Sequence, residues 1–167
     1  MGTIIRKAET DKEIQDIAIL AKKIWNQHFV PIIGQAQVDY MVEKFQSYPA
    51  LCTQVKEDGY EYYQILVDGA LAGYTGIHPE SGSLFLSKLY IEKSYRGRHL
   101  ATEAFRFLVS LCRERGLDKI WLTCNKHNDN TLSIYRHLGF EVTDTQEADI
   151  GNGFVMDDYI MTYVIEG

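Results

Sequence analysis

Residues 84–102 read LFLSKLYIEKSYRGRHLAT, and this stretch decides the fold. Its first part, residues 84–91, is rich in apolar and β-favouring side chains, which predicts a strand. A short polar turn follows, and an apolar-periodic helix begins within residues 96–101, RGRHLA. The first turn of a helix carries N–H groups without intrahelical partners and a partial positive charge. A strand that leads through a basic turn into a helix is therefore suited to bind an anion.

The composition of the basic turn suits a diphosphate. Gly97 permits positive φ and lets a ligand approach the main chain closely. Arg96 and Arg98 add fixed positive charge with paired donors that match phosphate. The turn has neither the Gly-rich loop ending in Lys-Ser or Lys-Thr of nucleoside triphosphatases nor the three glycines of a dinucleotide fingerprint. An ordinary helix start with exposed arginines would give the same pattern, so this turn alone leaves both interpretations open.

Two motifs, in order along the chain, resemble those of the GCN5-related N-acetyltransferase (GNAT) superfamily. The basic turn is similar to the acyl-coenzyme-A loop of that superfamily, and Arg96 and Ala101 match the ends of the loop motif. His99 stands where the superfamily usually has a second glycine. A residue other than glycine can still donate its N–H there if its φ is helical.

The second motif lies in residues 128–140, NDNTLSIYRHLGF. Its matching positions are Asn128, Tyr135, Gly139 and Phe140, with Thr131 in place of the usual alanine. Two independent motifs in the right order are far more specific than either alone. The resemblance covers at least residues 84–140, and the order of strands and helices extends it to nearly the whole chain.

Periodicity and turn residues predict the remaining elements. Strands are predicted at residues 3–7, 60–67, 71–78, 84–91, 119–124, 140–145 and 154–165, the last two joined by a Gly- and Asp-rich loop. Helices are predicted at residues 11–27, 97–115 and 128–137, with one more around Val38 to Phe45 that ends before Pro49. A capping box at Thr10 and Glu13 and a hairpin turn at Asp68-Gly69 support these boundaries. The strand at 84–91, the helix after it and the strand at 119–124 form a crossover unit, so these two strands should be parallel neighbours.

These elements predict a single domain over residues 1–167, of the α/β (α+β) class and similar to the GNAT fold. We expect a mixed, mostly antiparallel sheet of about seven strands, with a central parallel pair that splays apart, flanked by about four helices. Ligands of open α/β sheets bind where such strands separate.

The resemblance implies acetyl-CoA as cosubstrate and a set of cofactor-binding residues. The predicted set is Leu89, Tyr90, Ile91, Arg96, Gly97, Arg98, His99, Leu100, Ala101, Thr102, Asn128 and Tyr135. The pantetheine arm would pair with the main chain of Leu89 to Ile91, and the Ile91 N–H would polarise the thioester carbonyl. Asn128 would hydrogen-bond a pantetheine amide. Tyr135, two helical turns further on the same face, would protonate the departing thiolate as the catalytic acid.

Alternatives stay open for the catalytic groups. Tyr135 could instead be a half-buried aromatic side chain whose hydroxyl lies at the edge of the core. No general base is named, because the central strand has no carboxylate and Thr123 stands where some relatives have glutamate. Glu80 and Glu92 are expected to be solvated surface charges.

The bulk composition excludes several classes of protein. The chain has 167 residues with a net charge of −6, which disfavours nucleic acid as a partner. No apolar stretch approaches the length that spans a membrane, and the N-terminus lacks the apolar region of a secretory signal. Three scattered cysteines, Cys52, Cys112 and Cys124, indicate a reducing, cytoplasmic setting rather than a disulfide framework. The five histidines show no metal-ligand spacing, so no metal is expected.

The sequence leaves three functions in competition. The first is an acetyl-CoA-dependent N-acetyltransferase that acts on a primary amine of a small molecule by direct attack in a ternary complex. Weak, dispersed likenesses, including Gly73-Tyr74-Thr75-Gly76 and Asp157-Asp158, resemble bacterial spermine/spermidine acetyltransferases and imply a polyamine acceptor. The second function is acetylation of a protein N-terminus or lysine, and the third is a non-catalytic acyl-CoA sensor. The sequence does not fix the oligomeric state, although exposed late strands permit a homodimer.

Overall fold

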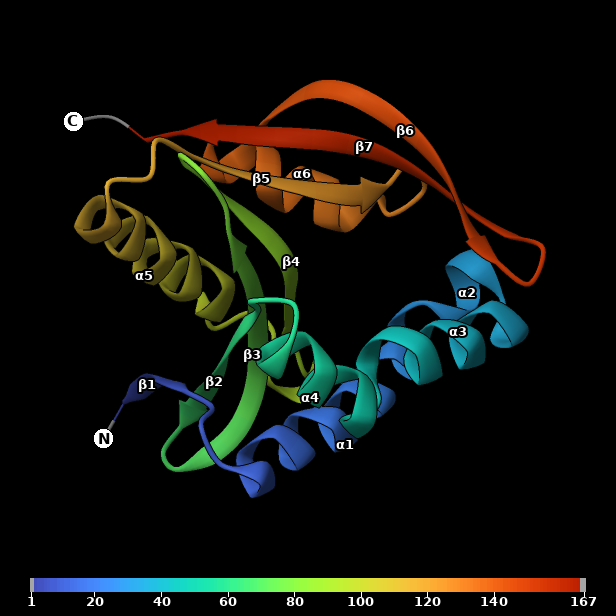
Figure 1. The fold of residues 1–167 in the computed structure, drawn as a ribbon, viewed down its shortest axis with the longest axis horizontal. Coiled ribbons are helices and arrows are strands. Elements are labelled where there is room, and N and C mark those ends of the chain that lie inside the picture. The colour runs from blue at the N-terminus through green and yellow to red at the C-terminus, as the bar shows by residue number, and fades with distance from the viewer. Residues whose placement is uncertain (1, 166–167) are drawn as a thin grey trace.

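A central sheet of seven strands in the order β1-β2-β3-β4-β5-β7-β6 organises the computed structural model, which describes residues 2–165 (Figure 1). The strands are β1 Thr3–Lys7, β2 Glu61–Val67, β3 Ala70–Pro79, β4 Ser83–Ile91, β5 Lys119–Asn125, β6 Glu141–Gly151 and β7 Phe154–Val164. All neighbouring pairs are antiparallel except β4 and β5, which are parallel. The predicted mixed sheet is confirmed.

The parallel pair at the centre separates partway along its length. β4 and β5 pair only where residues 83–85 face residues 119–121. Beyond this point β4 continues to Ile91 and β5 to Asn125 without pairing to each other. Because unpaired main-chain groups need other partners, the gap between the two strands is the natural place for a ligand.

A bulge in β4 changes which face its side chains occupy. Gly76 pairs with Lys88 but Ile77 pairs with Leu86, so Ser87 is an extra residue in β4. Leu84 and Leu86 accordingly belong to the core beneath α5, Leu100–Arg115. After the bulge, Lys88 and Tyr90 point to the opposite side of the sheet, where they contact the N-terminal helices.

Two cores cover the two faces of the sheet. On one face, α5 and α6 (Asp129–Leu138) pack on residues such as Ile120 and Leu122. On the other face, the N-terminal helices pack on Tyr62 and Tyr74. These helices are α1 Asp11–His28, α2 Val30–Ile33, α3 Gln35–Met41 and α4 Tyr48–Lys56, with a π-helical turn at Val42–Gln46 before α4. The predicted capping box holds the start of α1, where the Glu13 N–H donates to Thr10 Oγ1 at 3.2 Å.

Three features of the described structure differ from the sequence prediction. The helix expected at 97–115 begins at Leu100, because His99 before it has a left-handed φ of 60°. The helix expected around Val38 to Phe45 ends before Pro49 as predicted, at Gln46, but α4, which has Pro49 in its first turn where a missing N–H costs nothing, was not predicted. The penultimate strand runs to Gly151 instead of ending near residue 145, because cross-strand pairing with β7 outweighs its Gly- and Asp-rich composition. Residues 1, 166 and 167 lie outside the described chain, so the single domain over 1–167 stays a prediction.

Candidate functional site

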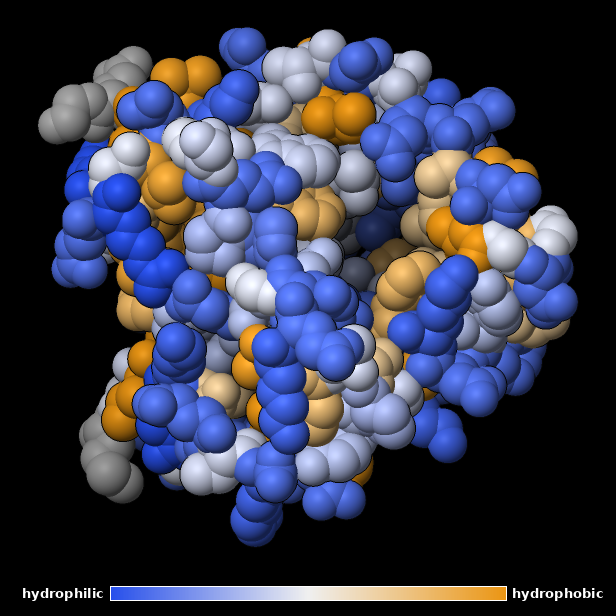
Figure 2. Space-filling model, viewed as in Figure 1, coloured by the Kyte–Doolittle hydropathy of each residue, from blue (hydrophilic) through white to orange (hydrophobic). Residues whose placement is uncertain are grey.

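A cavity of about 1020 Å³ occupies the gap between β4 and β5 and continues to both faces of the sheet. Figure 2 shows a hollow in one face of the molecule, between the central strands and the N-terminal helices. The predicted cofactor-binding residues that line the cavity are Leu89, Tyr90, Ile91, Arg96, Gly97, His99, Leu100, Ala101, Thr102, Asn128 and Tyr135. Arg98 is not among the described lining residues, and its guanidinium lies 5.4 Å from the centre of the Tyr95 ring.

The basic turn presents the start of α5 to this cavity. Gly97 has a φ of 83°, and a Cβ built on it would meet nothing within 4 Å, which leaves space for a ligand close to the main chain. The prediction that His99 donates its N–H to a ligand assumed a helical φ, but His99 has a left-handed φ of 60°. Instead, it reverses the chain just before Leu100, and the N–H groups of the first helical turn remain unpaired within the helix. The turn therefore has the donors and the space that a diphosphate requires.

The main chain of β4 exposes hydrogen-bonding groups to the gap. The Glu92 N–H donates to Ala72 O at 2.8 Å, and Tyr90 pairs with Tyr74. In an antiparallel ladder, alternate residues turn their N–H and C=O groups away from the partner strand. Leu89 and Ile91 therefore direct theirs into the gap, although Arg96 Nε already donates to Ile91 O at 3.2 Å. The edge fits the expected pairing with an extended ligand such as the pantetheine arm.

Tyr135 lies on α6 at the same gap. It is buried, packs edge-on against Phe140, and lines the cavity. The pKa of Tyr135 is raised, mainly by burial and to a smaller extent by the nearby Cys124. A phenol with a raised pKa stays protonated at neutral pH, which is the state a proton donor requires.

Asn128 precedes α6 and its side chain is engaged within the protein. Its Oδ1 lies 3.1 Å from His28 Nε2, a contact between the start of α6 and the end of α1. Burial lowers the pKa of His28, so this ring is neutral at neutral pH and donates from Nε2 to the Asn128 oxygen. Sequence reasoning missed His28, because the two residues are a hundred positions apart. Its contact fixes the orientation of the Asn128 amide.

The sequence assigned no catalytic role to two ionisable side chains in the cavity. Asp158 on β7 is 4% exposed, and burial, followed by the neighbouring Asp157, raises its pKa to about 6. Lys88 on β4 is 5% exposed, and burial lowers its pKa to about 7. Position in the sheet is the only signal for either residue. The bulge that turns Lys88 inward has no clear sequence signature.

Glu92 corrects an expectation about surface charges. It is 5% exposed, accepts a hydrogen bond from the Ser94 N–H at 2.9 Å and lies 3.3 Å from Lys23 Nζ. Hydrogen bonds from Ser94 lower the pKa of Glu92, which makes it a poor base and a structural cap of the basic turn. Glu80 is exposed, as expected, and accepts a hydrogen bond from Trp121 Nε1 at 2.9 Å.

Residues 2–165 contain neither a cluster of metal ligands nor a membrane-spanning helix. No group of three histidine, cysteine, aspartate or glutamate side chains in this range could hold a metal ion. None of the helices described is both long and apolar enough to cross a membrane.

Comparisons with known proteins agree with this geometry. A Bacillus subtilis protein provisionally named as a ribosomal protein bS18-alanine N-acetyltransferase is 29% identical over 89 residues, which cover 53% of this chain and 59% of that protein. The uncharacterized N-acetyltransferase YjgM of Escherichia coli is 25% identical over 130 residues, or 71% of this chain and 78% of that protein. The PaiA N-acetyltransferase of Thermoplasma acidophilum, solved in complex with coenzyme A, shares the fold with a TM-score of 0.82. That structure is 17% identical and covers 98% of this chain and 99% of its own.

The family model described as acetyltransferase (GNAT) family matches residues 22–140, which include the gap, the basic turn and α6. On this match, the chain belongs to the acetyltransferase (GNAT) family.

Proposed function

We propose that this GNAT-family N-acetyltransferase transfers an acetyl group from acetyl-CoA to a primary amine of a small molecule. A polyamine is one candidate acceptor. The observation that carries the proposal is the cavity that passes through the separated strands and reaches both faces of the sheet. An acceptor held on the face of the N-terminal helices would meet a cofactor held at the basic turn within one gap. Direct attack in a ternary complex then needs no covalent enzyme intermediate.

The residues of the gap fit acetyl-CoA, which supplies an acetyl thioester when bound. The first turn of α5 and Arg96 would hold its diphosphate, while Leu89 and Ile91 would pair with its pantetheine arm. The Ile91 N–H would donate to the carbonyl oxygen on which charge develops. Tyr135 would give its proton to the sulfur that leaves.

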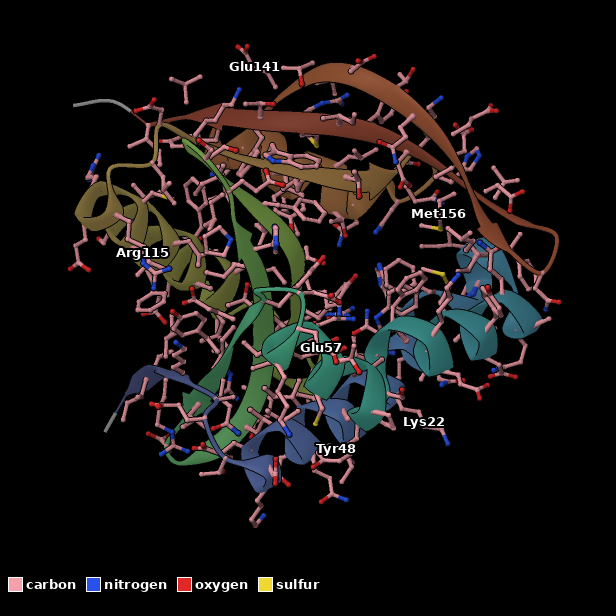
Figure 3. All side chains as sticks on the ribbon, viewed as in Figure 1. Lys22, Tyr48, Glu57, Arg115, Glu141 and Met156 are labelled. Atoms are coloured by element: carbon pink, nitrogen blue, oxygen red, sulfur yellow. The ribbon has the colours of Figure 1, made fainter. Side chains whose placement is uncertain are left out.

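The side of the gap where the amine acceptor would bind is covered by the β6–β7 hairpin, which favours a small molecule as acceptor. The tip of the β6–β7 hairpin reaches over the helices α2 and α3, and Met156 lies at this crossing (Figures 1 and 3). Tyr40 Oη and Lys44 Nζ each donate to Ile150 O at 2.7 Å. Gln37 Nε2 lies 3.6 Å from Met156 Sδ. Because the hairpin is bonded to the helical layer, an extended peptide would have to displace it, whereas a small amine would not.

A release assay tests the proposal. Purified protein with acetyl-CoA should release free thiol in the presence of at least one member of a panel of polyamines, amino acids, aralkylamines and aminoglycosides. If no amine or peptide releases thiol while coenzyme A still binds in calorimetry, the chain is an acyl-CoA sensor and the proposal is wrong.

Tyr135→Phe separates the enzyme from the sensor. We expect turnover to fall by about 100-fold, a typical effect of losing one general acid, with acetyl-CoA affinity nearly unchanged. The measurements are thiol release under saturating substrates and calorimetry with acetyl-CoA. Phe140→Leu, next to Tyr135 in the same core, is the control for packing. An equal loss of affinity and turnover in Tyr135→Phe would make Tyr135 a packing residue.

A second candidate acceptor is a protein N-terminus. It is favoured by the name of the Bacillus subtilis relative, which covers about half of this chain. A peptide with a free N-terminal alanine, added to the same panel, distinguishes it from a small amine.

We propose a cytoplasmic location as well, since Cys52, Cys112 and Cys124 are all free in the structure. The homodimer stays a prediction. β6 is an edge strand of the sheet and could pair with a second copy, but Asp144 and Glu147 on it oppose such pairing. Light scattering after gel filtration measures the mass directly.

A further inference from the structure

One carboxylate oxygen of Asp158 is buried without a hydrogen-bond partner among the described residues. The residue is 4% exposed, and its Oδ1 has no hydrogen bond within the described residues. A buried polar atom without a partner costs free energy, and proteins rarely retain one unless a ligand or an ion completes it. Asp158 also lines the cavity that passes through the gap. A bound donor is therefore the expected partner of this oxygen.

The sheet register shows which face of the sheet the Asp158 side chain occupies. On β7 it pairs with Asn125 of β5 and with Gln146 of β6, and paired side chains share a face. Cys124 and Tyr159, one position along, point to the other face, where α5 and α6 pack. Asp158 thus faces the side of the sheet that the N-terminal helices cover.

Asp158 is also close to the groups assigned to the chemistry. Tyr90 on β4 has its pKa raised by burial and then by the charges of Tyr135, Cys124 and Asp158. Tyr135, Cys124 and Asp158 therefore each lie within electrostatic range of Tyr90. An amine nitrogen bound at Asp158 would therefore lie near Tyr90, in the part of β4 whose main chain is expected to hold the thioester.

The part of the cavity wall that the N-terminal helices and β7 supply includes several apolar and aromatic side chains. Trp25, Phe29, Met41, Phe45 and Met156 line the same cavity. Trp25 stacks on Phe29 with ring centres 4.2 Å apart, and Tyr90 meets the edge of Phe29 at 5.9 Å. Among the described lining residues, Asp158 is the one carboxylate. A polyamine would bring several ammonium groups to a site with a single anionic partner.

We propose that Asp158 binds and deprotonates the ammonium group of the acceptor, and that the acceptor is a monoamine with an apolar or aromatic body. This inference rests on the proposed acetyltransferase function and narrows its substrate class. Asp158 supplies the general base that the sequence did not reveal. The ring faces and methionines around it contact the rest of the acceptor.

The proton balance of the step is complete. One N–H bond of the ammonium breaks and one O–H bond forms on Asp158, which leaves the nitrogen with its lone pair. The nitrogen attacks the acetyl carbon, the carbon–sulfur bond breaks, and Tyr135 gives its proton to the sulfur. The nitrogen then releases a second proton, which restores Tyr135, while the proton on Asp158 passes to solvent. The net reaction yields an amide, a thiol and one proton.

The charges around Asp158 suit a base that works near neutral pH. Burial and Asp157 raise its pKa to about 6, and Lys126 lowers it. Tyr90 on β4 and Cys124 on β5, the latter on the other face of the sheet, lie within electrostatic range of Asp158 as neutral groups, since burial raises the pKa of each. His28 at the end of α1 lines the same cavity, and burial lowers its pKa. Activity that needs ionised Asp158 should therefore rise with pH through about 6.

The test compares Asp158→Asn with Asp157→Asn. Asp157 is the neighbouring residue, its side chain is 41% exposed, and it pairs with Lys126 at 2.8 Å. With coenzyme A bound, phenethylamine is titrated into each protein in a calorimeter. We expect Asp158→Asn to weaken phenethylamine binding by at least about tenfold, Asp157→Asn to change it less than about twofold, and both to bind coenzyme A normally.

Kinetics supply an independent readout. For phenethylamine, kcat/KM should exceed that for spermidine by about tenfold and should fall by about 100-fold in Asp158→Asn, with loss of the rise near pH 6. Asp158→Glu should restore part of the rate.

Three results would overturn the inference: no binding of phenethylamine to the wild-type protein, equal binding by Asp158→Asn, or a preference for spermidine. Thiol release with spermidine but not phenethylamine would leave the acetyltransferase proposal intact and reject only the monoamine assignment. No thiol release with any amine would reject the acetyltransferase proposal itself.

Discussion

At the scale of the residue, His99 shows how one backbone angle controls a binding loop. Its φ of 60° is a conformation that glycine adopts freely and that other residues adopt at a cost of about 1 kcal/mol. The position that the superfamily usually gives to glycine thus keeps a glycine-like backbone despite the substitution. The motif predicted where the loop lies, but it could not predict this angle, because φ at a non-glycine residue depends on the packing around it.

His99→Val tests whether the left-handed angle matters for binding. A β-branched residue resists positive φ, so we expect the free energy of unfolding to fall by about 1–2 kcal/mol and coenzyme A affinity to fall about tenfold. His99→Gly is the matched variant and should keep affinity within about threefold. Urea denaturation and calorimetry give the two quantities. If His99→Val binds coenzyme A as tightly as His99→Gly does, the left-handed angle has no role in binding by the basic turn.

The same scale shows what the sequence could reveal of the site. Asn128 and Tyr135 were predicted as site residues from the resemblance to the GNAT motif, and their spacing of seven residues suits one face of a helix. From the sequence, Asp158 entered only a weak likeness to polyamine acetyltransferases, since its burial depends on strand pairing across β5, β6 and β7. Non-local register is the information that local patterns lack.

At the scale of the element, Lys88 joins β4 to the helical layer. Its Nζ donates to Phe45 O at 2.8 Å and to Gln54 Oε1 at 2.9 Å, and it also bonds the Tyr62 hydroxyl. Phe45 belongs to the π-helical turn at Val42–Gln46. The bulge at Ser87 and this turn are therefore two irregular segments that share one buried lysine.

Lys88→Met should detach the π-helical turn from the strand. We expect a loss of about 2–4 kcal/mol in the free energy of unfolding, because Phe45 O and Gln54 Oε1 lose a buried donor. The folded-state pKa of about 7 lies below the unfolded value, so the unfolded chain binds more protons between these values. Wild-type stability should accordingly rise from pH 7 to pH 9, and Lys88→Met should lack this part of the rise.

Urea denaturation at both pH values measures the effect. Lys93→Met, at an exposed lysine just beyond β4, is the control and should change stability by less than about 0.5 kcal/mol. A Lys88→Met protein with wild-type stability and an unchanged pH slope would show that the lysine does not hold the two elements together.

At the scale of the whole molecule, the hairpin of β6 and β7 joins the sheet to the helical layer. Gly151, with φ at 94°, lies so close to Tyr40 that a Cβ there would approach the Tyr40 hydroxyl to 2.7 Å. Ile150 and Met156 also pack on the cluster of Trp25, Phe29, Val38 and Met41. The sequence predicted both strands but ended the first one too early, and nothing in its pattern showed that their tip would reach α3.

Combining Tyr40→Phe with Lys44→Met should loosen this closure. Both donors to Ile150 O are lost, so amide hydrogens near the hairpin tip should exchange about tenfold faster. KM for the amine should rise. Coenzyme A affinity should stay unchanged, because neither Tyr40 nor Lys44 belongs to the basic turn at the start of α5. Thr143→Val, far from the tip, is the control, and its hydroxyl bonds only within the hairpin. Unchanged exchange in the double variant would refute closure through these two bonds.

The short seam between β4 and β5 has a mechanical consequence. Residues 83–85 and 119–121 provide the only pairing between the two halves of the sheet within the described chain. Two stiff halves joined over so few residues can rotate about that seam more easily than strands paired along their full length. A molecule seated in the gap touches both halves, and its arrival restricts that rotation.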